Sequence, residues 1–400
     1  MWRLGFFFHE MGFGLLSIFL PLYIVSLAPT NGLFYIGINS ALALFLAIPA
    51  SFLWGYLCDK TRRYKRYILL SFLASTVFLY LFTLTTSVGL LIILYAAMAI
   101  LHVAHEPPKN VLIAELYSRE DWERTFASYE GFTEVGLLIG LLLGFFMSTY
   151  GLSPANTLLM VSGLNLVAFA LSAILVKDPL LIFERGLVSI EKTIDFTFHG
   201  VFLASKLLDG ISVKERLRRE NVGAFCGGLI LFSLATSTLF TPMPIFISNI
   251  TRTAGFSTSI VFVIYVLNSG GGVVGYVMAG RRSGRSVGKA NLGRIVIFRS
   301  LLAFLLIAAL QIPVYNVGLT IVILMLMSFA YAMFLIYTLS LSMELIPAGK
   351  AGLFNVLIGI GGACGSFIGP FIAQTFGFFY VFILAGVIFS SAYIAFKIFA

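Results

Sequence analysis

The sequence predicts an all-α integral membrane protein in which twelve transmembrane helices form two pseudo-symmetric six-helix bundles. Its composition, its apolar runs and an internal repeat support this fold class. Hydrophobic residues make up 60% of the 400 residues and charged residues only 11%, whereas soluble domains are nearer one quarter charged. The 40 Phe and 38 Gly residues suit helices that face lipid and approach one another closely.

Twelve apolar runs are long enough to span a membrane, which takes about 20 residues. They lie near 4–27, 33–57, 67–85, 88–114, 124–149, 153–176, 222–248, 256–279, 293–311, 316–343, 351–373 and 376–396. A polar segment separates the first six from the last six. We therefore expect an N-terminal bundle over 1–176, a cytoplasmic linker over 177–221 and a C-terminal bundle over 222–400. Within the linker, Ile194–Leu208 is amphipathic and is expected to lie along the membrane surface.

The two halves repeat one another at four places along the chain. The matched pairs are Phe19–Tyr23 with Pro242–Phe246, Gly55–Tyr56 with Gly275–Tyr276, Ala114–Leu116 with Met343–Leu345, and Tyr150–Gly151 with Phe376–Gly377. One repeat period fits all four pairs, and chance explains this poorly. The repeat therefore predicts two similar halves.

The charge distribution predicts the orientation of the chain. The net charge is +9, but the basic residues gather in alternate loops, at 60–66, 177–219 and 281–289, while the opposite loops carry only Arg252. This is the positive-inside pattern. We therefore expect both termini in the cytoplasm and the protein in an inner or plasma membrane, and the pattern argues against nucleic acid as a partner.

The first apolar run argues against a signal peptide, and the cysteines argue against a disulfide framework or a metal site. His9 and Glu10 would not be tolerated in the core of a signal peptide, so we expect this run to remain as a span. Cys58, Cys226 and Cys364 are scattered, and they predict neither a disulfide framework nor a metal site. We expect them to be small buried hydrophobic residues.

The loop between the second and third spans carries the most informative motif, which reads GYLCDKTRRYKR from Gly55 to Arg66. Its key residues are Gly55, Asp59, Lys60 and Arg63. The pattern resembles the signature loop of the major facilitator superfamily, although that family usually has Gly where this chain has Arg62. A weaker copy recurs at 275–282, with Ala279 in place of the acid.

The resemblance implies a secondary transporter whose two halves rock around a central site near the membrane midplane. It also implies that Asp59 is a latch against the N-terminus of the eleventh helix, where a carboxylate gains about 0.3–1 kcal/mol. Lys60 and Arg63 would be its cationic surroundings, and Glu115 a second acid. Because Ala279 replaces the acid, the latch is expected on one side only. The alternative is that the basic loop merely fixes the topology.

Ionisable residues inside the spans form the second signal, since each costs roughly 2.5–3.5 kcal/mol on insertion scales. The first half carries His9, Glu10, His102, His105, Glu106, Lys109, Glu130 and Glu134. The second half carries only Arg294 and Arg299, which we expect to snorkel from the cytoplasmic start of the ninth span. One hypothesis is a proton-coupling site in which Glu134 or Glu106 titrates and a histidine assists. The other is a structural salt-bridge network built by Lys109.

Glycine and proline patterns predict local departures from plain helices. Gly136, Gly140 and Gly144 recur every four residues in the fifth span, as do Gly361, Gly365 and Gly369 in the eleventh. Such ladders let helices approach closely. Pro107 and Pro108 lack backbone N–H groups and predict a kink, or else an ion held by the freed carbonyl groups.

These observations favour a secondary transporter working by alternating access. The residues of the second half that we expect to line its central cavity are Ser237, Asn268, Tyr331 and Asn355. Ordinary packing is the alternative role for each of them. The excess of acids favours a cationic or lipophilic cargo exported by a proton-coupled antiporter, as in multidrug efflux. Proton symport of a polar or anionic metabolite and passive uniport are the alternatives.

Partners and energy source follow from the same patterns. We expect a small-molecule substrate, protons and membrane lipids as partners and a monomeric protein. No cofactor or metal is expected, and the absence of a nucleotide-binding loop makes the proton gradient the expected energy source. An enzyme is disfavoured because the pair His102 and His105 lacks a third partner in the sequence. A non-transporting receptor on the same fold is the remaining reading.

Overall fold

The computed structural model describes residues 1–116, 122–178, 222–282, 289–311, 316–345 and 352–399. Every regular element in these ranges is a helix. Twelve segments are long and apolar enough to cross a membrane, as predicted. The amphipathic stretch expected at Ile194–Leu208 lies outside the described residues.

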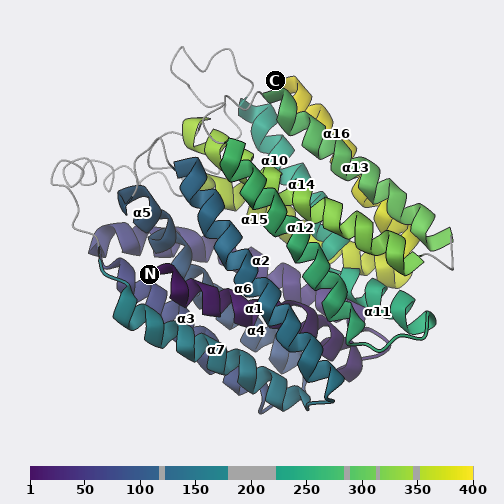
Figure 1. Ribbon diagram of the computed structural model, residues 1–400, viewed down its shortest axis with the longest axis horizontal. Helices are drawn as coiled ribbons and strands as arrows, with labels where there is room; N and C mark the ends of the chain where they lie inside the picture. Colours follow the sequence, from purple (N-terminus) through teal and green to yellow (C-terminus); the bar gives the residue numbers. More distant parts are fainter. Residues whose placement is uncertain (117–121, 179–221, 283–288, 312–315, 346–351, 400) are drawn as a thin grey trace.

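Each half contributes six of the twelve segments. The first half comprises α1 (Arg3–Leu27), α2 (Gly32–Thr61), α3 (Tyr64–Phe82), α4 (Val88–His102) with the 3₁₀ turn η1 (Val103–His105) and α5 (Glu106–Leu116), α6 (Trp122–Thr149) and α7 (Pro154–Leu175). The second comprises α10 (Val222–Phe240) with α11 (Met243–Thr253), α12 (Ile260–Arg282), α13 (Lys289–Gln311), α14 (Asn316–Leu345), α15 (Gly352–Thr375) and α16 (Phe378–Phe399). The two halves lie side by side, and both chain termini lie at the end of the molecule opposite α11 (Figure 1).

Two of the predicted spans are interrupted rather than continuous. The fourth tightens into the 3₁₀ turn Val103–His105 and resumes as α5, because Pro107 and Pro108 cannot donate to the preceding turn. The seventh breaks between Phe240 and Met243, beside Pro242 and Pro244. The kink predicted in the fourth span is confirmed, and the break in the seventh is a correction.

The glycine ladders hold helices together within each half. A Cβ atom at Gly140 would lie 1.9 Å from the carbonyl oxygen of Met11 on α1, and one at Gly369 would lie 2.0 Å from that of Thr238 on α10. Real Cβ contacts are essentially never closer than 3.0 Å. The fifth span therefore packs on the first, and the eleventh on the seventh, only because these positions are glycine, as predicted.

The halves meet along α2 with α15 and along α6 with α12. The amide of Gln374 donates to the carbonyl oxygen of Thr30 at 2.8 Å, and one hydrophobic cluster joins Phe6 and Ile68 of the first half to Met333 of the second. The space enclosed between these two seams is where the site lies.

The basic loop begins at a strained residue. Arg62 ends α2 with φ of 52°, and it is the one non-glycine residue with positive φ within the described ranges. A left-handed residue other than glycine costs roughly 1–2 kcal/mol, which gives a physical reason for Gly at this place in the related motif. The backbone N–H of Lys65, at the start of α3, donates to Asp178 Oδ1 at 2.8 Å.

The latch at Asp59 stays a prediction. Asp59 and Arg63 are exposed, and the Lys60 ammonium lies 5.7 Å from the ring of Tyr56. Residues 346–351, which precede α15, and the side chain of Glu115 lie outside the described part of the structure. A Cβ at Gly55 would meet no atom within 4 Å.

The cysteines correct an expectation from the sequence. All three are free thiols, but only Cys58 is buried, whereas Cys226 is half-buried and Cys364 is exposed. A thiol in an apolar helix can face lipid, a cavity or the protein interior, and hydropathy does not distinguish these surroundings.

Candidate substrate and proton site

Three histidine rings meet inside the first half. The ring centroid of His9 on α1 lies 4.9 Å from that of His102 and 5.0 Å from that of His105, and the last two lie 4.9 Å apart. His9 and His105 are buried and His102 is half-buried. The third partner that His102 and His105 lack in the sequence is thus supplied in space by the first helix.

The hydrogen bonds of His9 define its tautomer. Asn165 on α7 donates through Nδ2 to the carbonyl oxygen of Val161 at 2.9 Å, so its Oδ1 is the atom that lies 2.6 Å from His9 Nδ1. An amide oxygen only accepts, and therefore His9 Nδ1 carries a proton. His9 Nε2 is buried and has no hydrogen-bond partner among the described residues.

The hydrogen bonds of His105 place a proton on its Nδ1 by the same reasoning. Its Nδ1 lies 2.6 Å from the carbonyl oxygen of His102, which can only accept. Its Nε2 lies 3.2 Å from Glu106 Oε1, and Lys109 Nζ lies 2.6 Å from Glu106 Oε2. The Glu106 carboxylate is therefore held between the imidazole and the ammonium group.

Charge balance singles out two carboxyl groups. Lys109 Nζ also lies 3.9 Å from Glu130 Oε1, so Lys109 is shared by two acids, Glu106 and Glu130, and the His105 ring contacts the first of them. Glu10 and Glu134 have no ion pair with any described residue. They are the acids in this cluster for which ionisation has no direct cationic partner.

Glu134 connects the two halves of the molecule. Ser269 Oγ on α12 donates to Glu134 Oε1 on α6 at 2.5 Å. The side chain also lines a cavity between the halves. Glu10 on α1 lies within electrostatic range of both Glu134 and Glu130, so these acids act on one another from α1 and α6.

The histidine cluster does not fit a metal ion as it stands. Candidate ligand atoms of His9, His102 and His105 lie within 4.8 Å of one another, whereas nitrogens about 2.0–2.1 Å from one tetrahedral Zn²⁺ would lie about 3.3 Å apart. The rings of His9 and His102 are stacked at 23°, so their in-plane lone pairs do not converge. His105 Nε2 faces Glu106 instead.

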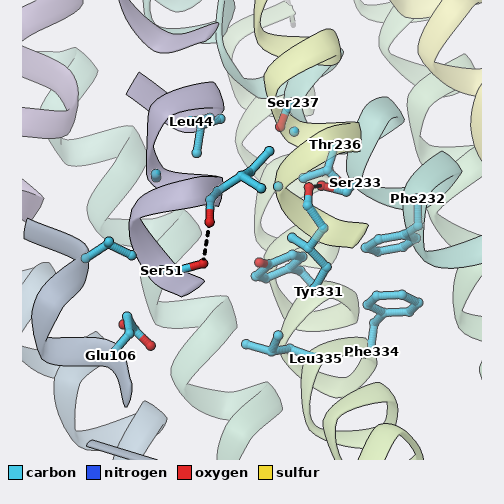
Figure 2. Close-up of a pocket in the computed structure, with 16 residues that line it drawn as sticks. Leu44, Ser51, Glu106, Phe232, Ser233, Thr236, Ser237, Tyr331, Phe334 and Leu335 are labelled. Carbon is cyan, nitrogen blue, oxygen red and sulfur yellow. Dashed lines mark hydrogen bonds between the residues drawn. The ribbon is translucent and has the colours of Figure 1, made fainter. Parts of the chain in front are cut away.

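Two cavities lie between the halves and share Thr236 and Tyr331 in their walls. The Glu106 cavity, about 310 Å³, is lined by α2, η1, α5, α10, α14 and α15. Figure 2 shows Glu106 on one side of it, across from Tyr331 and Leu335. The Arg299 cavity, about 250 Å³, is lined by α1, α6, α10, α12, α13 and α14.

Arg299 contradicts the expectation that it snorkels. Its side chain is 0% exposed and lies midway along α13, whereas Arg294 is exposed as expected. The guanidinium carbon lies near four aromatic rings: 4.8 Å from Phe232, 5.0 Å from Phe389, 5.3 Å from Tyr331 and 5.7 Å from Phe240. Sequence reasoning named this residue but assigned it to the cytoplasmic start of the span, whereas its place in the middle of an apolar span is the signal of burial.

The Arg299 cavity gathers polar atoms without partners. Among the described residues, the buried atoms of its lining that make no hydrogen bond are Thr236 Oγ1, Tyr265 OH, Asn268 Oδ1, Arg299 Nε and Arg299 Nη1. Buried polar groups are normally satisfied, so this concentration in one cavity indicates a place where a bound molecule completes the hydrogen bonding.

Three of the four cavity candidates from the second half line a cavity. Ser237 lines the Glu106 cavity, Asn268 the Arg299 cavity, and Tyr331 both. The side chain of Asn355 lies outside the described part of the structure. Thr236, Tyr265 and Ser269 are absent from the sequence-based prediction, and Arg299 appears in it only as a snorkelling residue.

The sequence matches one family model over most of its length. The family model described as Major Facilitator Superfamily matches residues 4–357. The chain belongs to this superfamily. A search of curated proteins returned no match.

Several solved members of the superfamily share its fold. The nucleoside transporter NupG aligns with a TM-score of 0.73 and 13% identity, over 100% of this chain and 99% of its own. The human organic anion transporter MFSD10 aligns with 0.69 and 17%, over 99% and 97%. A D-xylose-proton symporter aligns with 0.68 and 17%, over 100% and 97%. This superfamily member is therefore a multi-pass membrane protein with the fold of these transporters.

Proposed function

We propose that this protein is a proton-coupled secondary transporter that moves a small molecule by alternating access, with Glu134 as the coupling acid. One observation carries the proposal: Glu134 belongs to the first half, lines the cavity between the halves and accepts a hydrogen bond from Ser269 of the second half. Its protonation state therefore bears directly on a contact that must break when the halves rock apart.

The surroundings of Glu134 favour an exchangeable proton. The ionisable groups that face it are Glu10 from α1, Glu130 from its own helix, Tyr276 from α12 and Tyr331 from α14. None of these is a cation, and Lys109 is already paired with Glu106 and near Glu130. Arg299 lines the same cavity but makes no ion pair with Glu134. A buried carboxylate without a cation is costly, so proton uptake stabilises the closed contact between the halves.

The cargo expected from the sequence was a cationic or lipophilic compound leaving by antiport, and that expectation rested on the excess of acids. Arg299 is buried and has no ion pair among the described residues, so it adds a positive charge to the cavity. The geometry therefore supports the alternative, proton symport of a polar or anionic molecule.

The positive-inside pattern supports cytoplasmic termini in an inner or plasma membrane.

Hydrogen–deuterium exchange at about pH 5.5 and pH 8, corrected for intrinsic exchange rates, tests the coupling without a known substrate. The wild-type protein should change protection in α6 and α12 between the two values, and Glu134→Gln should hold the low-pH pattern at both. Asp178→Asn is the control and should behave like the wild type, because Asp178 follows α7, accepts from the N–H of Lys65 and lines neither cavity. If Glu134→Gln retains the full pH response, Glu134 is not the coupling acid.

A further inference from the structure

The guanidinium of Arg299 occupies an unusual position for a charge. It is fully buried in the middle of a membrane-length helix, and no carboxylate in the described residues lies within ion-pair distance. Arginine or lysine at the centre of a span marks a substrate or ion pathway by default, because its burial is otherwise unfavourable. A structural role would normally supply a partner carboxylate or carbonyl group.

The aromatic rings around Arg299 stabilise the charge but leave its hydrogen-bonding capacity open. Cation–π contacts with Phe232, Phe389, Tyr331 and Phe240 engage the positive charge through the ring faces. They do not accept conventional hydrogen bonds, and Nε and Nη1 have no acceptor among the described residues. The site thus holds a cation whose Nε and Nη1 hydrogens are free for a ligand.

We infer that Arg299 binds the anionic group of the transported molecule, and that this molecule is an organic monocarboxylate with an apolar or aromatic body. The inference rests on the proposed transport function and names its substrate class. A single guanidinium matches a single anionic group. The hydroxyl groups of Thr236 and Tyr265, both without partners, can donate to the same carboxylate.

The walls of the cavity suit the rest of such a molecule. Phe240, Tyr276 and Tyr331 line the Arg299 cavity of about 250 Å³, which adjoins the Glu106 cavity of about 310 Å³ at Thr236 and Tyr331. Ligand sites usually measure about 300–1,000 Å³ and combine apolar walls with a few polar groups. An aromatic or branched body has room here, and Asn268 Oδ1 offers one acceptor.

The same cavity explains why a proton would travel with the anion. Glu134 lines it from the opposite half, and an ionised carboxylate there repels a second one. Glu10, Glu130, Tyr276 and Tyr331 face Glu134 from the elements packed on it. Lys109 on α5 pairs with Glu106 and lies near Glu130 and Glu10, and Arg299, which Tyr331 also faces, lines the cavity with Glu134 but makes no ion pair with it. Protonation of Glu134 removes the repulsion, so the anion binds more tightly at low pH.

The test measures binding to the purified full-length protein by thermal shift and calorimetry at about pH 6 and pH 8. The probes are phenylacetate, its neutral amide, phenethylamine and phenyl phosphate. We expect phenylacetate to bind, with an affinity about tenfold higher at pH 6, and the amide and the amine to bind at least tenfold more weakly. The monocarboxylate assignment is overturned if the amine binds preferentially, if the amide binds equally well, or if phenyl phosphate binds more tightly. Benzoate and indole acetate are two further monocarboxylate probes, and the assignment is also overturned if neither they nor phenylacetate bind.

Variants separate recognition from folding. Arg299→Met should keep or raise the melting temperature, because an apolar residue replaces a buried charge, and should weaken phenylacetate binding about 10- to 100-fold. Arg299→Lys retains the charge if the Met variant does not fold, and should lose less affinity. Arg294→Gln, on the exposed part of the same helix, is the matched control and should bind normally. Unchanged affinity in Arg299→Met overturns the inference.

The two proposals fail separately. Phenylacetate binding that requires Arg299 but does not depend on pH would leave the anion site in place and remove Glu134 as the coupling acid. A pH response in hydrogen exchange that disappears in Glu134→Gln, with no anion binding, would keep the coupling and reject the substrate class.

Discussion

Gly140→Ala is the perturbation whose effect the structure defines most sharply. The new Cβ would lie 1.9 Å from the carbonyl oxygen and 2.8 Å from the carbonyl carbon of Met11, and 3.1 Å from the backbone nitrogen of Leu15. All three neighbours are backbone atoms of α1, so no side chain can rotate away. Since carbon contacts are optimal near 3.5–4.0 Å, α1 and α6 must separate by about 1 Å or more.

That separation loosens the packing of the whole α1–α6 seam. Overpacking of this kind typically costs about 1–3 kcal/mol, and we expect Gly140→Ala to lower the free energy of unfolding in detergent–SDS titrations by that amount. Gly163→Ala on α7 is the control, because its Cβ would meet nothing within 4 Å. Its stability should stay within about 0.5 kcal/mol of the wild type. Equal stability of the two variants would refute the close-contact reasoning.

Two further predictions concern strain and charge. Arg62→Gly should raise the free energy of unfolding by about 1 kcal/mol, since glycine adopts the observed φ of 52° without a Cβ clash. A loss of stability in the same titration would show that the side chain of Arg62 matters more than its backbone strain. Lys109→Met should destabilise the protein by about 3–5 kcal/mol at neutral pH, because Glu106 and Glu130 lose their shared cation. The deficit should shrink as pH falls, because the uncompensated carboxylates take up protons, and a deficit that grows instead would contradict the charge count.

The charge network divides the acids by task. Glu106 lies against Lys109 and the His105 ring, and Glu130 lies near Lys109, which suits the structural salt-bridge hypothesis. Glu134 stands apart at the boundary between the halves, which suits proton coupling. The two hypotheses for the buried cluster thus apply to different residues rather than excluding one another.

The number and order of the spans could be read from the sequence alone. Backbone groups in a bilayer must be satisfied within a helix, so hydropathy and length determine where each span lies. The glycine ladders at Gly136 and Gly361 were also predictable, because a missing side chain permits close approach whichever helix is the neighbour. The break at Val103–His105 follows from the two prolines.

The make-up of the site was decided by tertiary packing. Arg294 and Arg299 lie on one apolar helix with faces about 140° apart, and hydropathy does not tell which face turns inward. His9 joins His102 and His105 only because α1 packs against α7, where Asn165 orients its ring. Ser269 reaches Glu134 across the seam between the halves. Whether a buried charge has a partner depends on helices distant in the chain, and only the folded arrangement brings those helices together.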